Sequence, residues 1–350
     1  MNRRHFVASA SAAAAALSNT RLLAADGKRP MIGLDHFAVR AAGMKAPALI
    51  DYAASLKLDI IFISELGPLE SKDEAYLKKL KAQADAAGLK IYSGGMSICK
   101  SSNTYKPEQG DPVAYTEDLI RIAKTLGSPV ARCVLGNAKD RTTDGGIQKH
   151  IEECVRVLKA VKSRCEAEGV QIAIENHAGD MQSYELKALI EAAGKDHVGA
   201  NIDPGNAVWS LEDPMVNLEV LGPYTICSSI RDSMIWETEE GAMVQWTAVG
   251  EGIVDFKAYT KRFAELAPGA PLNVETISGF AKPFTYLKEE FWAPYSTVPA
   301  AGFAAWVALS KRGKPIDSFK APEGADKKAA ETAYQKGELE RSTKWLQANL

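Results

Sequence analysis

Four short β-favouring segments in the second half of the chain each end on a polar or charged residue followed by a turn. They are residues 170–175, 198–203, 224–232 and 271–275, and helix-like segments separate most of them. Such alternation is typical of parallel βα units. In a (β/α)₈ barrel the carboxyl ends of all the strands meet at one face. The pattern therefore predicts that Glu175, Asp203 and Glu275 form one oxygen-rich pocket, of the kind that binds a divalent cation.

The first half of the chain continues the same alternation. Helical periodicity predicts four helices between the β-favouring segments, and glycine or proline marks several of their ends. The expected strands cover residues 31–37, 58–64, 89–95 and 129–135, and the expected helices 46–56, 73–87, 112–126 and 146–169. Eight strands without a strong break predict one (β/α)₈ TIM barrel at 26–282, with a C-terminal aromatic and helical extension at 283–350 packed on it.

The N-terminus resembles a twin-arginine export signal. Arg3 and Arg4 precede Phe6, an alanine-rich run and a small-residue stretch that ends near Ala25. We therefore expect residues 1–25 to be a signal and the protein to be periplasmic or secreted. The alternative is an alanine-rich N-terminal helix. Stable membrane insertion is not expected, because a span needs about 20 apolar residues.

Composition argues against several classes of protein. The formal net charge is −2 and no basic block follows the signal, so a nucleic acid is not an expected partner. The five cysteines form no C-x-x-C pair, which is against a structural zinc site or a disulfide framework and indicates buried free thiols. The sequence leaves a homo-oligomer open.

Two segments are additions to the eight βα units of a minimal barrel. Residues 236–254, with Trp246, form a long segment between the last two expected strands, and we expect it to reach over the site as a loop. Residues 280–300 are rich in aromatic side chains that either line a sugar site or pack an added helix. Helices are expected at 301–311 and 326–350.

A series of motifs resembles that of the sugar phosphate isomerase/epimerase family. The motifs are Glu175-Asn-His177, Asp203-Pro-Gly205, Ser229-Ile-Arg-Asp232, Val249-Gly-Glu-Gly252 with Asp255, and Glu275. The resemblance covers about residues 31–278 and implies a xylose isomerase-like barrel, which endonuclease IV shares. In members of the ketose 3-epimerase type, Glu, Asp, His and Glu hold a divalent metal. By resemblance these positions are Glu175, Asp203, Ser229 and Glu275.

Ser229 departs from the family pattern, which has histidine at this position. A hydroxyl is a weaker ligand than imidazole, so affinity for a transition metal should fall. The resemblance implies a divalent metal cofactor, Mn²⁺, Mg²⁺, Co²⁺ or Zn²⁺. Either this metal or Arg231 must offset the repulsion among three convergent carboxylates.

Two histidines are candidates for the site. Strand side chains alternate, so His177 should lie on the same face as Glu175 and either coordinate the metal or bind substrate. The alternative for His177 is a hydrogen bond to the backbone. His36, at the end of the first strand, is the second candidate, while His150 and His197 are expected to be solvated.

The resemblance implies a metal-dependent sugar isomerase or epimerase. A carboxylate removes a proton beside a carbonyl, and an acid returns it to the resulting enediolate. By resemblance Glu175 and Glu275 are the two acid/base groups. The expected substrate-binding residues are His177, Asn206, Arg231, Trp246, Arg132 and His36. A keto-glycoside lyase or hydrolase, a non-catalytic sugar-binding barrel and an endonuclease are the alternatives, and the small number of histidines disfavours the last.

Overall fold

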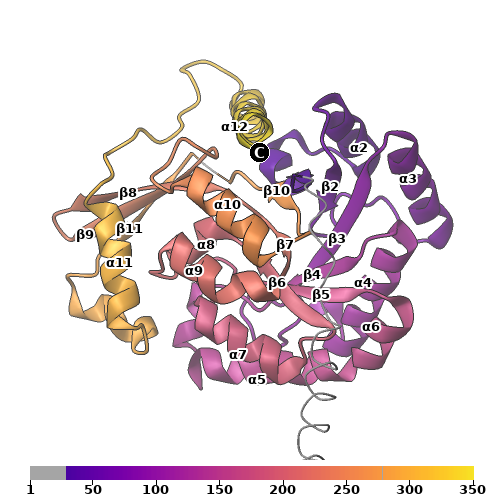
Figure 1. Cartoon of the computed structure of the whole chain (residues 1–350), viewed down its shortest axis with the longest axis horizontal. Coiled ribbons are helices and arrows are strands. Elements are labelled where there is room, and N and C mark those ends of the chain that lie inside the picture. The colour runs from indigo at the N-terminus through magenta and orange to yellow at the C-terminus, as the bar shows by residue number, and fades with distance from the viewer. Residues whose placement is uncertain (1–28, 278) are drawn as a thin grey trace, which may run out of the picture.

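The computed structural model describes residues 29–277 and 279–350, so the expected export signal lies outside the described residues. Eight parallel strands form a nearly closed barrel in the order β10-β1-β2-β3-β4-β5-β6-β7 (Figure 1). The predicted TIM barrel is confirmed. Its strands are β1 (Ile32–Asp35), β2 (Ile60–Ile63), β3 (Lys90–Ser97), β4 (Val130–Val134), β5 (Gln171–Glu175), β6 (Val198–Ile202), β7 (Thr225–Ser228) and β10 (Leu272–Val274).

The barrel closes between β7 and β10 through a short seam. Ile230 and Val274 form a parallel bridge just past the end of β7. The amide of Ile230 donates to the carbonyl of Asn273 at 2.7 Å, and the amide of Glu275 donates to the carbonyl of Ile230 at 2.9 Å. This seam fixes the backbone on both sides of Arg231 and Glu275.

The barrel strands are buried on both faces, as expected for a parallel sheet covered by helices. The side chains of β2, with the sequence Ile-Ile-Phe-Ile, are all buried. Alternate residues enter two cores: Ile60 and Phe62 pack inside the barrel, whereas Ile61 and Ile63 pack against the surrounding helices.

The surrounding helices begin and end at residues that favour those positions. Asp111 accepts the amides of Val113 and Ala114 at the start of α4, and Gly127 ends that helix with a left-handed φ of 75°. The expected helix at 146–169 is divided at Val161, which leaves the helical ψ range. The helices are α2 (Ala46–Ser55), α3 (Glu74–Ala86), α4 (Pro112–Leu126), α5 (Gly146–Ala160), α6 (Lys162–Glu168), α7 (Ser183–Ala193), α8 (Pro204–Trp209), α9 (Pro214–Leu221) and α10 (Phe256–Leu266), with the 3-10 helices η1 (His36–Ala42), η2 (Pro107–Gln109), η3 (Ala138–Thr142) and η4 (Gly222–Tyr224).

The segment expected as a long loop before the last barrel strand is mainly a hairpin. Its strands β8 (Asp232–Thr238) and β9 (Gly241–Thr247) pair antiparallel, and β11 (Ala281–Phe284) joins the other side of β9. This small sheet and α11 (Ala300–Ser310) lie beside the barrel (Figure 1). Together with η5 (Glu289–Tyr295), they enclose a second apolar core around Phe284 and Trp306. The aromatic segment therefore builds packing beside the barrel.

The last helix, α12 (Lys327–Asn349), returns to the barrel. Leu339 and Leu346 enter the main core, and Gln335 accepts the amide of Ala41 at 2.8 Å. In Figure 1 α12 lies beside β10 and α2, the place where the eighth helix of a barrel is expected. Among the described residues, no helix is long and apolar enough to cross a membrane.

Candidate active site

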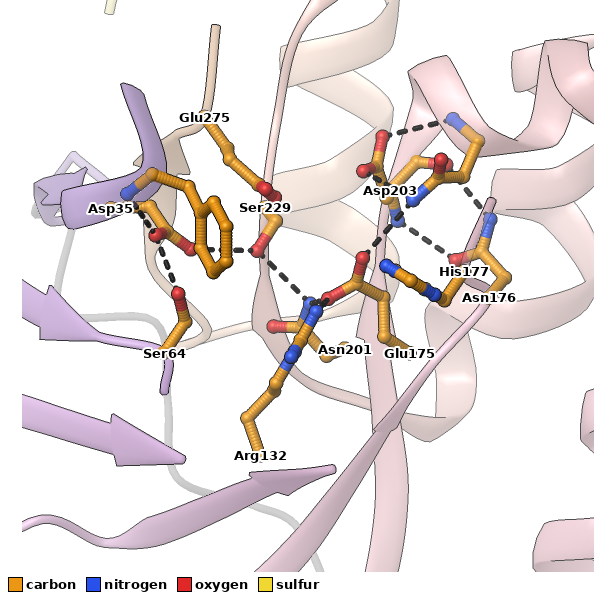
Figure 2. Close-up of polar contacts among 12 residues, drawn as sticks. Asp35, Ser64, Arg132, Glu175, Asn176, His177, Asn201, Asp203, Ser229 and Glu275 are labelled. Carbon is orange, nitrogen blue, oxygen red and sulfur yellow. Dashed lines mark hydrogen bonds and ion pairs between the residues drawn. The ribbon is translucent and has the colours of Figure 1, made fainter. Parts of the chain in front are cut away.

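Three buried carboxylates meet at the carboxyl ends of the strands. Glu175 is the last residue of β5, Asp203 directly follows β6, and Glu275 directly follows β10. One oxygen from each lies within 4.8 Å of the others. The structure thus brings together the three acids that the sequence singled out, and Figure 2 shows their side chains pointing toward one another.

Glu175 accepts hydrogen bonds from three side chains. Oε2 accepts hydrogen bonds from Nε of Arg132 at 2.7 Å and from Nη2 of the same arginine at 2.6 Å. It also accepts one from Nδ2 of Asn201 at 2.9 Å. Oε1 receives Nδ2 of Asn206 at 3.0 Å. Arg132 is buried and also donates to the carbonyl of Gly95 at 3.1 Å. Glu175 and Arg132 are therefore a buried, charge-assisted pair in which most acceptor positions of the carboxylate are filled.

Asp203 has two structural roles. Its Oδ1 caps α8 by accepting the amides of Gly205 at 2.8 Å and Asn206 at 3.0 Å. Its Oδ2 accepts Nδ2 of Asn206 at 2.7 Å and forms an ion pair with Nη2 of Arg231. Burial raises the pKa of Asp203 to about 6, although Arg231 opposes the shift, and repulsion from Glu175 adds to it. All four acceptor positions of this carboxylate are in use.

Glu275 differs from the other two acids because one of its oxygens is free. Oε2 accepts Nη2 of Arg231 at 3.0 Å, whereas Oε1 has no hydrogen-bond donor among the described residues. Burial raises the pKa of Glu275 well above its ordinary range, Arg231 opposes the shift, and the neighbouring acids add to it. Glu275 is thus the acid of the three that is suited to hold and release a proton.

His177 also presents a free atom to the site. Its Nδ1 lies 2.6 Å from the carbonyl of Gly136, so Nδ1 must carry the hydrogen and Nε2 the lone pair. Loss of hydration lowers the pKa of His177, and the nearby Arg132 and Arg231 add to the effect while Glu175 opposes it. The ring is therefore neutral near pH 7. Nε2 makes no hydrogen bond within the described part of the chain.

Asp180 holds the two loops that orient this imidazole. Its Oδ1 accepts the amide of His177 at 2.8 Å, and its Oδ2 accepts the amide of Gly136 at 3.1 Å. The donor and the acceptor of the imidazole hydrogen bond are therefore fixed to one buried carboxyl group.

His177 is expected to make the protein less stable as the pH falls below its ordinary pKa of 6.5. Since the folded-state pKa of His177 is lowered, the unfolded chain binds its proton first, and the stability present above 6.5 is lost as the pH falls toward the folded pKa. One such proton gives a slope of at most ~1.4 kcal/mol per pH unit. The difference in stability between the wild type and His177→Gln, measured by urea unfolding at a series of pH values, should show this slope. Buried acids with raised pKa values, such as Asp203 and Asp232, act in the opposite direction but are present in both proteins. Equal slopes would assign the pH dependence to other groups.

Ser229 is engaged in a chain of hydrogen bonds. Its hydroxyl accepts Nδ2 of Asn201 at 3.1 Å and donates to Oδ2 of Asp35 at 3.3 Å. Asp35 in turn accepts the hydroxyl of Ser64 at 2.6 Å (Figure 2). Ser229, which by resemblance takes the position of the family histidine, therefore links the ends of β6, β7 and β1. Its hydroxyl proton is donated to Asp35.

The remaining expected binding residues lie around this centre. Arg231 is buried against Trp246, with its guanidinium carbon 4.3 Å from the centroid of the tryptophan ring. His36 lies at the first strand end, with Nδ1 3.5 Å from Asp35 and Nε2 3.9 Å from Glu65. These two acids raise the pKa of His36 although burial lowers it.

The prediction that His150 and His197 are solvated is wrong. His150 faces inward from α5, where Nδ1 lies 2.8 Å from Oγ of Ser101. His197 is buried, and its Nε2 lies 3.0 Å from the carbonyl of Leu158. His150 engages both ring nitrogens inside the protein, since its Nε2 lies 2.6 Å from Oγ1 of Thr143. His197 engages only Nε2, and its buried Nδ1 has no hydrogen-bond partner among the described residues.

Sequence reasoning missed three residues that organise the site: Asp35, Asn201 and Asp180. Asp35 is the last residue of β1 and Asn201 the last but one of β6, so both lie within two residues of a strand end, close to the positions of the predicted acids. That position was the available signal for both. Asp180 lies in a loop, and no spacing rule connects it to Gly136.

Glu175, Asp203, Glu275 and Ser229 are the residues that would hold a divalent metal. The three acids form a buried group that could hold a metal ion, because one ion can reach an oxygen of each. However, N–H donors fill all acceptor positions of Asp203. In addition, Nη2 of Arg231 contacts a carboxyl oxygen of Asp203 and one of Glu275. The hydroxyl of Ser229 is also engaged. In this arrangement the residues do not fit a resident divalent ion, since the ion would have to displace the arginine.

Comparisons with known proteins agree with the fold. A family model described as "Xylose isomerase-like TIM barrel" matches residues 50–291. A 3-oxo-isoapionate decarboxylase of Pectobacterium atrosepticum is 20% identical over 213 residues, which are 60% of this chain and 70% of the decarboxylase.

Two solved structures share the architecture at low sequence identity. D-psicose 3-epimerase with D-tagatose, from Clostridium cellulolyticum H10, has a TM-score of 0.59 at 15% identity, covering 90% of this chain and 99% of the epimerase. The IolI protein with a bound zinc atom has a TM-score of 0.55 at 14% identity, covering 80% and 95% of the two chains. At these identities the likeness shows the fold alone.

Proposed function

The chain belongs to the xylose isomerase-like TIM barrel family, and from this premise we propose that it is a carbohydrate isomerase or epimerase. It would move a proton to and from the carbon beside a carbonyl group. One observation carries the proposal: two proton-transfer groups with opposite pKa shifts, the buried Glu275 and the half-buried His177, each keep one atom without a hydrogen-bond partner among the described residues.

Opposite pKa shifts give the two groups complementary roles. Neutral His177 is the base, because its Nε2 lone pair can accept the proton of the substrate carbon. Protonated Glu275 is the acid, because its raised pKa keeps a proton available for the other face of the same carbon. In the reverse direction the roles exchange. Glu175, expected from the resemblance as the second acid/base group, is less suited because it is paired with Arg132.

The carbohydrate substrate is supported by chemistry and by the comparisons. An α-hydroxy carbonyl unit has the acidic C–H and the two neighbouring oxygens that this group of donors and acceptors can bind. The structural neighbour named above is an epimerase with a ketose, D-tagatose. Asn206 and His36 are our candidates for holding the sugar hydroxyls.

Removal of the proton places negative charge on the carbonyl oxygen, and a cation must stabilise it. The first candidate is the guanidinium of Arg231. The second is a divalent ion, which would supply Lewis-acid chemistry if Glu175, Asp203 and Glu275 released their present donors. The clustering of the three acids supports this second candidate, whereas the donors that already fill Asp203 are against it.

The proposal is tested by exchange of the substrate proton. The purified protein is incubated in deuterated water with a panel of ketoses, aldoses and keto-sugars, and proton NMR follows the C–H signal beside the carbonyl. We expect loss of that signal together with appearance of an epimer or isomer for at least one sugar. Absence of exchange with every member of the panel would contradict the proposal.

A lyase acting on a keto-sugar is the second candidate function. The same proton abstraction would then expel a group from the neighbouring carbon. The decarboxylase relative, which acts on a 3-oxo compound according to its name, favours this candidate. Release of the leaving group in the exchange assay distinguishes it, and a sugar that binds without exchange would indicate a sugar-binding barrel.

A further inference from the structure

Arg231 occupies the position that a bridging metal would need. It follows the end of β7 at the closing seam, and its side chain is almost fully buried. A single nitrogen, Nη2, forms an ion pair with Oδ2 of Asp203 and donates a hydrogen bond to Oε2 of Glu275 at 3.0 Å. The two acids thus share one positive group that belongs to the protein.

The side chain of Arg231 is held by a stack of aromatic rings. Its guanidinium lies over Trp246, which is stacked on Trp209 at a centroid distance of 4.0 Å and an interplanar angle of 17°. Nζ of Lys282 lies 4.0 Å from the centroid of the Trp209 ring. Nε1 of Trp246 donates to the carbonyl of Gly205 at 2.9 Å, which fixes the plane of the ring. These contacts orient the guanidinium before any ligand binds.

Glycine at position 205 leaves the space that Arg231 fills. A Cβ atom there would lie 2.4 Å from Cγ and 2.7 Å from Cδ of Arg231. Any larger residue would push the arginine away from Asp203. The Asp203-Pro-Gly205 turn therefore provides both the carboxylate that binds the guanidinium and the room for its aliphatic part.

The guanidinium also has capacity left for a ligand. Nε and Nη1 of Arg231 are buried and have no hydrogen-bond partner among the described residues. Buried donors without partners are rare in folded proteins, and arginine always carries its charge. An oxygen atom with developing negative charge would satisfy these donors.

We propose that Arg231 is the resident cation of the site and that it stabilises the oxyanion in place of a divalent metal. The proton of the substrate carbon passes to Nε2 of His177, the C–H electron pair forms the C=C bond, and the carbonyl π pair moves to oxygen. The resulting enediolate oxygen accepts hydrogen bonds from Arg231. Glu275 then returns a proton to carbon and the C=O bond reforms. This chemical role depends on the proposed function, whereas the replacement of the metal does not.

Metal binding tests the replacement without any substrate. The full protein is dialysed against a chelator, and Mn²⁺ is titrated by calorimetry into the wild type, Arg231→Gln and Arg231→Lys. A buried guanidinium and a divalent ion repel strongly at the distances that a shared carboxylate imposes. We expect no saturable Mn²⁺ binding below ~1 mM in the wild type and in Arg231→Lys, and one site at least ~10-fold tighter in Arg231→Gln, because only glutamine removes the charge.

Several results would overturn the proposal. One is about one equivalent of metal in the purified wild type, and another is micromolar Mn²⁺ affinity that Arg231→Gln leaves unchanged or weakens. Near-UV circular dichroism checks the fold of each variant. If Arg231→Gln does not fold, the metal content and Mn²⁺ titration of the wild type and of Arg231→Lys decide the question. Arg262→Gln, on the exposed surface, is the control for charge removal.

A second readout separates this inference from the proposed function. Where a sugar undergoes exchange, we expect the exchange rate of the wild type to stay within about twofold after chelator treatment and to fall ~10²–10³-fold in Arg231→Gln, the usual cost of losing a donor to an oxyanion. Loss of exchange after chelation, with recovery on adding Mn²⁺, would refute the role of Arg231 while supporting the isomerase. Absence of exchange with every sugar would refute the function alone and leave the metal titration to be judged by itself.

Discussion

Replacing Glu275 with glutamine is expected to lower the rate of epimer formation by ~10²–10⁴-fold, the usual contribution of a positioned acid or base. Glutamine keeps the size of the side chain and an oxygen for Nη2 of Arg231 but cannot deliver a proton. The melting temperature should change little, because burial and the neighbouring acids already raise the pKa of Glu275 and an amide resembles the protonated carboxyl. Product formation and exchange in deuterated water are measured for the same sugar.

The rate of epimer formation and the rate of proton exchange should respond differently to substitution of Glu275 and of His177. With Glu275→Gln, His177 can still remove and return the proton on its own side, so exchange without inversion should persist. With His177→Gln, both exchange and inversion should fall. Glu212→Gln is a matched control, because Glu212 is also buried and has a raised pKa but hydrogen bonds to Ser183 and Asn217. Wild-type product formation in Glu275→Gln would remove Glu275 from the reaction.

Replacing Arg132 with methionine should lower the free energy of unfolding by about 3–5 kcal/mol, the cost of removing one partner of a buried ion pair. This is the largest loss of stability that we expect from any substitution proposed for this site. Arg132 and Glu175 are both almost fully buried, and two guanidinium nitrogens lie within 2.7 Å of Oε2. Without them Glu175 keeps only the neutral donors Asn201 and Asn206. Urea unfolding measures the loss.

A double variant tests the cause of this loss. Arg132→Met with Glu175→Gln removes both charges, and most of the lost stability should return, because the penalty comes from an unpaired buried carboxylate. Arg262→Met serves as a surface control, since its pair with Glu219 is exposed and should leave the melting temperature almost unchanged. Equal stability of the single and double variants would show that packing of the arginine, and not its charge, matters.

The sequence alone determined the barrel and the positions of the three acids. Short β-favouring segments alternate with segments of helical periodicity along the chain, and this pattern depends only on the types of residue at each position. In a barrel, a position at the carboxyl end of a strand, or directly after it, is enough to place a side chain at the common mouth. Glu175, Asp203 and Glu275 were therefore predictable as neighbours from their place in the order of elements.

The C-terminal part could be predicted only in outline. The composition of the two segments predicts the helices α11 and α12. Nothing in the sequence of α12 indicates that this helix packs in the place of the eighth barrel helix, after the segments that form the small sheet. The hairpin of β8 and β9 was expected as a loop, because its role depends on pairing with β11, a segment far along the chain.

Only the tertiary structure decided how the three acids differ. Their sequence contexts are similar, yet Glu175 is paired with Arg132, Asp203 caps a helix and holds Arg231, and Glu275 keeps a free oxygen. These differences come from hydrogen bonds between residues on separate strands and loops. Burial then moves the pKa values of Glu275 and His177 in opposite directions, because loss of hydration favours the neutral form of an acid and of a base alike.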